Sequence, residues 1–76
     1  MDPAALLLRI RVITVSTRAA VRSLKPGDPQ VPAVVERGRM LLEHLEAQAL
    51  ADQNQDEEVR LAFAQARMEL ESAGGP

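Results

Sequence analysis

The sequence predicts an all-α fold, a small three-helix bundle in which a long N-terminal helix packs on an antiparallel helical hairpin. Three segments repeat apolar residues at helical spacing, and a proline-rich stretch and a polar turn separate them. At 76 residues the chain forms one domain at most. We expect helices at about 3–24, 30–52 and 55–72, with a linker at 25–32 and a frayed tail at 73–76.

The first expected helix opens with Asp2 as an acidic cap and Pro3 at the first helical position. Leu, Ile, Val and Ala cover so much of its surface that we expect it to be the most contacted helix of the bundle. A strand over residues 9–15 is the alternative, because β-branched residues are common there. We favour a helix, because the adjacent Val12 and Ile13 are both apolar and break the alternation of a strand.

The second and third expected helices each have one main apolar face. Gly38 lies in the middle of the second helix's face, where glycine costs about 1 kcal/mol of helix propensity. Either a neighbouring helix approaches closely there, or the glycine is a tolerated imperfection. Asn54 or Asp56 should cap the third helix, and Arg67 should pair with Glu71 one turn away. The two predicted faces are Val31, Val34, Val35, Leu41, Leu42, Leu45 and Ala49, and Val59, Ala62, Phe63, Ala66 and Leu70.

The composition argues against catalysis and cofactor chemistry. The chain has no cysteine, which excludes disulfides and thiolate zinc sites. Its single histidine, His44, has no acidic residue one helical turn away that could complete a metal site. No serine has an apparent paired base, and nothing indicates a carboxylate pair in a cleft. We therefore expect no enzymatic activity, cofactor, metal or small-molecule substrate.

Targeting signals are not evident in the sequence. The chain begins Met1-Asp2-Pro3 without a basic start, and Arg9 interrupts the first apolar run, unlike a secretory signal. No segment approaches the roughly 20 apolar residues of a membrane span. We expect a cytoplasmic protein.

Charge is distributed unevenly along the chain. Residues 1–25 have a net charge of +4 and residues 26–76 a net charge of −6. Four basic residues of the first helix and its end fall in one stripe, which we predict to bind a partner: Arg11, Arg18, Arg22 and Lys25. An acidic partner, the acids of the other two helices or nucleic-acid phosphates could balance this basic stripe, and a solvated face is the alternative. Nucleic acid fits poorly, because the overall charge is −2 and Phe63 is the only aromatic residue.

Second apolar stripes lie on the outer sides of the last two helices, and we predict that they bind a partner: Met40, Ala47 and Leu50, and Leu61, Ala64 and Met68. Clustered exposed apolar residues mark association surfaces, although scattered ones are normal. We therefore predict a non-catalytic helical protein–protein interaction module, such as a small subunit, adaptor or chaperone-like partner. It would bury aliphatic stripes in a homo- or hetero-oligomer, with the basic stripe supplying selectivity.

Residues 33–45, AVVERGRMLLEHL, resemble the second helix of ribbon-helix-helix regulators. The resemblance covers about half the chain and implies a dimeric DNA-binding regulator or antitoxin, with residues 9–15 as the ribbon strand. The chain departs from the pattern at Ala19 and Ala20, where the intervening helix needs larger core residues. This is the alternative hypothesis for function. A weaker one is binding of the first helix to an anionic membrane surface.

Overall fold

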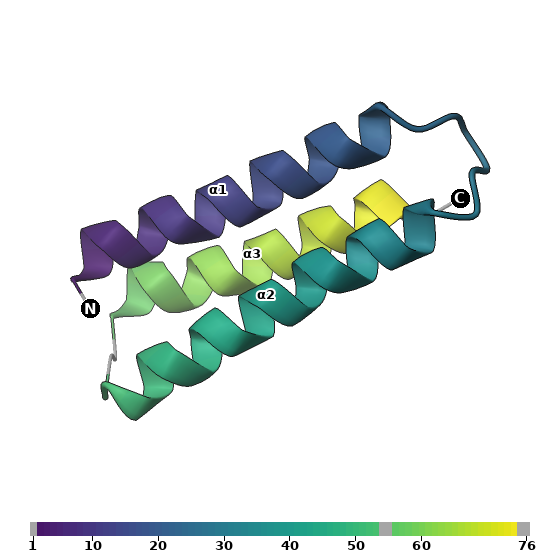
Figure 1. Ribbon diagram of the computed structural model, residues 1–76. Helices are drawn as coiled ribbons and strands as arrows, with labels where there is room; N and C mark the ends of the chain where they lie inside the picture. Colours follow the sequence, from purple (N-terminus) through teal and green to yellow (C-terminus); the bar gives the residue numbers. More distant parts are fainter. Residues whose placement is uncertain (1, 54–55, 75–76) are drawn as a thin grey trace.

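The computed structural model describes residues 2–53 and 56–74, and within these ranges it consists of three α-helices and their connections (Figure 1). The helices are α1 (Pro3–Arg22), α2 (Val31–Ala51) and α3 (Glu57–Gly74). α1 and α3 run in the same direction, α2 runs against both, and every pair of helices is in contact. The predicted all-α three-helix bundle is confirmed. Residues 9–15 lie within α1, so the strand alternative is wrong.

α1 begins as predicted but ends earlier. Pro3 takes the first helical position, and the Asp2 carbonyl accepts a hydrogen bond from the Leu6 N–H at 3.0 Å. The side chain of Asp2 makes no capping hydrogen bond, so its predicted role as a side-chain cap is wrong. The helix ends at Arg22 rather than near residue 24. The Leu24 N–H donates to the Val21 carbonyl at 3.1 Å, three residues back, and Pro26 just beyond cannot continue a helix.

The linker turns sharply before α2. Gly27 adopts φ +81°, a conformation that glycine reaches without steric cost. The Asp28 carboxylate then accepts a hydrogen bond from the Gln30 N–H at 2.8 Å, and the Asp28 carbonyl accepts one from Val31 at 3.0 Å. This local turn starts α2 at Val31, one residue later than predicted, with Pro32 in its first turn.

Asp56 supplies the cap of α3. Its carboxylate accepts hydrogen bonds from the N–H groups of Glu58 at 2.9 Å and Val59 at 3.2 Å. α3 therefore starts at Glu57, two residues later than predicted, and continues to Gly74, past the predicted end. The other candidate cap, Asn54, lies outside the described residues, as do the last two residues of the predicted frayed tail.

An aliphatic core surrounds Phe63 and contains residues of all three helices: Leu6, Ile10, Leu42, Leu45, Ala49, Val59, Phe63, Ala66 and Leu70. Two threonines of α1 are also buried, and the Thr14 hydroxyl donates to the Ile10 carbonyl at 2.8 Å. Most of the predicted apolar faces point inward. Leu41 is the main exception, because it is 48% exposed at the edge of α2 that faces α1.

Gly38 marks the closest approach of α1 and α2. A Cβ atom placed on Gly38 would lie 2.5 Å from the Thr17 hydroxyl oxygen and 2.8 Å from the Thr17 methyl carbon. A side chain at position 38 therefore requires Thr17 or α1 to move. Of the two interpretations of this glycine, close approach of a neighbouring helix is confirmed.

Candidate functional site

The basic stripe of α1 lies beside α3. Arg11 and Arg18 line the boundary between the two helices together with Gln65 and Glu69. The Arg18 guanidinium is 3.9 Å from the Glu69 carboxylate, and both side chains are about 40% exposed. One acid of the α2–α3 hairpin, Glu69, thus pairs with one member of the stripe, Arg18. Arg11 and Arg22 are exposed on α1, and Lys25 is exposed in the linker.

The predicted outer stripes of α2 and α3 are all exposed, but they do not form one surface. Met40 and Ala47 lie on the outer face of α2, and Leu61, Ala64 and Met68 lie on the outer face of α3. Leu50 borders a separate hollow near the α2–α3 turn. The predicted residues are therefore exposed on the outer sides of two helices, and Leu50 also lines this hollow.

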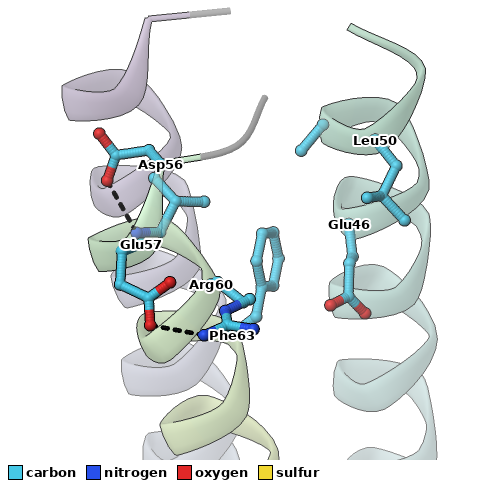
Figure 2. Close-up of a pocket in the computed structure, with 8 residues that line it drawn as sticks. Glu46, Leu50, Asp56, Glu57, Arg60 and Phe63 are labelled. Carbon is cyan, nitrogen blue, oxygen red and sulfur yellow. Dashed lines mark hydrogen bonds and ion pairs between the residues drawn. The ribbon is translucent and has the colours of Figure 1, made fainter. Parts of the chain in front are cut away.

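The hollow near the α2–α3 turn has a volume of about 310 Å³. Figure 2 shows Leu50 and Glu46 on its α2 wall, and Arg60 and Phe63 on its α3 wall. Its carboxylates are engaged: Asp56 caps α3, Glu57 pairs with Arg60 at 2.5 Å, and Glu46 binds Arg67. These acids are held by protein groups, and the apolar part of the lining is Ala49, Leu50, Val59 and Phe63.

The ion pair between Arg67 and Glu46 joins the two helices of the hairpin. The Arg67 guanidinium donates to both carboxylate oxygens of Glu46 at 2.5 and 3.3 Å, and this hydrogen bonding raises the pKa of Arg67. The pairing joins α2 to α3, so the predicted pairing of Arg67 with Glu71 along α3 is wrong. Arg39 binds Glu36 and Glu43 on the outside of α2, and its hydrogen bonds lower the pKa of the Glu36 carboxyl.

No group of three or more potential metal ligands occurs among the described residues. None of the helices in the described part of the chain is long and apolar enough to cross a membrane.

A third exposed apolar surface, which we did not predict from the sequence, lies on α1. α1 is the most contacted helix, as expected, yet its Leu8, Val12 and Val15 are 65%, 57% and 55% exposed. The reason is geometric, because a helix in a three-helix bundle contacts two neighbours and leaves its outer side open. Together with Ala5 and Ala19, these residues follow one another at alternating intervals of three and four positions, which is the spacing of a coiled-coil seam. That spacing was visible in the sequence.

This exposed stripe borders a groove between α1 and α2, the α1–α2 groove. Its wider end, of about 370 Å³, is lined by Leu8, Arg9, Val12, Ile13, Leu41, His44, Leu45 and Gln48. Its narrower end is lined by Ser16, Thr17, Ala20, Val34, Arg37, Gly38 and Leu41. Leu41 lines both ends, which follow one another along α1 and α2. Its charged lining residues are Arg9 and Arg37.

Comparison with known proteins gives no match to a family model, a characterised protein or a solved structure.

Proposed function

We propose that this protein is a cytoplasmic, non-catalytic protein–protein interaction module that acts by burying exposed aliphatic side chains against a partner. One observation carries the proposal: eight large apolar side chains are between 48% and 69% exposed. They are distributed over all three helices: Leu8, Val12, Val15, Met40, Leu41, Leu50, Leu61 and Met68. Large exposed apolar patches on small proteins mark interaction sites.

The energetic argument favours association. Fully burying a Val, Leu or Met side chain contributes about 1.5–3 kcal/mol, and these residues are still between 48% and 69% exposed. A partner that covers only some of them offsets the loss of translational and rotational freedom that binding costs. The apolar surface therefore provides affinity, and the arginines of α1 provide selectivity and steering.

The ribbon-helix-helix alternative has lost its structural support. It requires residues 9–15 to form a strand that pairs across a dimer, and those residues form the middle of α1. The side chains that would contact DNA from a strand in that arrangement are on a helix instead.

Size-exclusion chromatography with light scattering, at several concentrations, tests the proposal when combined with affinity purification from the native host. We expect a defined oligomer, or one stoichiometric protein partner, with the unmodified chain. Association should weaken in at least one of two variants, Leu8→Ser/Val12→Ser or Leu61→Ser/Met68→Ser, because each removes one exposed apolar patch. A chain that stays monomeric and retains no protein partner contradicts the proposed function.

A further inference from the structure

We propose that the α1–α2 groove binds an amphipathic α-helix of a partner protein, with an aliphatic stripe flanked by aspartate and glutamate. This inference rests on the proposed interaction function and specifies its site and the chemistry of the partner.

The shape of the groove suits a helix. Leu8 and Val12 of α1 form one wall, Leu41 of α2 forms the other, and the partly buried Ile13 lies between them. The groove extends from Leu8 to Ala20 along α1, twelve helical steps or about 18 Å at 1.5 Å per residue. A partner helix of three to four turns fills this length, and its stripe packs against two helices at once.

The charge of the groove selects an acidic partner. Arg9 lies at the wider end and Arg37 at the narrower end, both exposed, and no aspartate or glutamate is among the lining residues. Neither arginine forms an ion pair with the described residues. α1 also has four arginines and no acidic residue between Pro3 and Arg22. Arginine forms bidentate hydrogen bonds with carboxylates, so acids flanking a docked stripe find partners on both sides.

A second copy of this chain, docked groove to groove, is a poorer occupant. Two grooves facing one another bring Arg9 and Arg37 of one copy close to the same residues of the other, with no carboxylate in the lining to separate them. Juxtaposed like charges disfavour such a complex. A membrane surface fits less well too, because Ile13 and the buried Leu45 lie within the groove, where a flat lipid surface does not reach.

Binding of designed peptides tests the inference by fluorescence anisotropy. Three labelled helical peptides share one leucine stripe and differ only in their flanking residues, which are Glu, Gln or Lys. We expect the Glu peptide to bind about tenfold more tightly than the Gln peptide, with the Lys peptide weakest. The preference should shrink as salt is added, because the flanking charges are exposed. Equal or reversed affinities, or no binding of any peptide, overturn the inference.

Two variants locate the binding site. Val12→Ser/Leu41→Ser should weaken binding of the Glu peptide about tenfold or more, and the control Leu61→Ser/Met68→Ser, of equal or greater exposure, should leave it unchanged. Arg9→Glu/Arg37→Glu leaves the apolar lining intact and should reverse the order of the Glu and Lys peptides. Circular dichroism checks that each variant remains folded.

The alternative occupants give different results. Binding that is lost only in the Leu61→Ser/Met68→Ser control overturns this inference but leaves the interaction function standing. Dimerisation that Val12→Ser/Leu41→Ser abolishes, without peptide binding, assigns the groove to a second copy and overturns the acidic partner. Sedimentation with phosphatidylserine vesicles, without peptide or protein binding, overturns both the inference and the proposed function.

Discussion

The α2–α3 hairpin and α1 use their charges in different ways. In the hairpin, Arg67 bridges the two helices through Glu46, and Arg39 and Arg60 each bind acids one turn away. α1 has no acid of its own, and its one ion pair within the described structure is the long contact of Arg18 with Glu69. Within the described residues, the hairpin therefore pairs three of its four arginines, with Arg37 as the exception, whereas α1 pairs one of its four.

The apolar residues of α1 show the same contrast on opposite faces. Leu6 is 1% exposed in the core, and Leu8, two residues later, is 65% exposed outside it. Both faces have the spacing of a packed helix, yet the bundle covers only one. We infer that the inner face stabilises the fold and the outer face contributes little to folding. Four predictions test these contrasts between α1 and the hairpin and between the two faces of α1, beginning with the largest expected effect.

The same substitution on the two faces of α1 should have very different costs. Leu6→Ala should lower the free energy of unfolding by about 3 kcal/mol, because it removes buried contacts and leaves a cavity. Leu8→Ala should change it by no more than about 0.5 kcal/mol, since the side chain is exposed and Ala favours helix as well as Leu does. Urea unfolding followed by circular dichroism gives both values. Similar losses at the two positions contradict the division into inner and outer faces.

At Gly38, the steric cost of adding a side chain between α1 and α2 should exceed the gain in helix propensity. Gly38→Ala places a Cβ atom 2.5 Å from the Thr17 hydroxyl oxygen, and such overpacking costs about 1–3 kcal/mol. Alanine favours helix over glycine by about 1 kcal/mol, so the net change should be destabilising. Thermal unfolding by circular dichroism measures it.

The control is the same substitution in a Thr17→Ala background. The nearest remaining atom is then the Cβ atom of residue 17, at 3.2 Å from the new methyl group. Gly38→Ala should become neutral or stabilising there, because the Thr17 hydroxyl and methyl groups that would crowd the new Cβ atom are gone and the gain in helix propensity remains. If Gly38→Ala stabilises the unmodified protein, the helices separate easily at this point and the contact is unimportant.

Local sequence predicted the helices well and their ends less well. The three apolar periodicities set the number and type of elements, because each helix must cover one apolar face. The starts of α2 and α3 depend on hydrogen bonds of two single carboxylates, Asp28 and Asp56, which neighbouring residues could also have supplied. Gly38 could not be interpreted from sequence alone, because its explanation is Thr17, a residue of another helix.

The candidate site was predicted only in part, for a physical reason. The outer residues of α2 and α3 are exposed as expected, because each of those helices has one dominant apolar face to turn inward. α1 has apolar residues on both faces, so periodicity does not reveal which face the bundle buries. The groove also could not be predicted from the sequence, because its lining combines residues of two helices, such as Val12 of α1 and Leu41 of α2.

The ion pair within the hairpin should be worth more than the one that α1 makes. A double-mutant cycle with Glu46→Gln and Arg67→Gln should give a coupling energy of about 0.5–1 kcal/mol, a value reduced by the partial exposure of both side chains. The cycle with Glu69→Gln and Arg18→Gln should give a value near zero, since the charged atoms are 3.9 Å apart and partly solvated. Equal coupling energies would remove the electrostatic contrast between the hairpin and α1.

The smallest effect is the pH dependence of Glu36 on the outside of α2. Its hydrogen bonds with Arg39 lower its pKa below the usual 4.5. The folded state therefore releases this proton more readily than the unfolded state does. The resulting stabilisation is present above pH 4.5 and disappears as the pH falls through the lower pKa of the folded state.

Comparing the unmodified protein with Glu36→Gln isolates this contribution, because the other carboxylates titrate in both. The unmodified protein should be slightly more stable above pH 4.5, and the difference should vanish at lower pH and shrink in high salt. Thermal unfolding by circular dichroism between pH 3 and pH 7 measures it. α1 supplies the matched control, because its outer face has no carboxylate and Val12→Ser should not alter the pH profile. A difference that grows on acidification has the wrong sign for a carboxylate stabilised by Arg39, and would show that the pair does not form in solution.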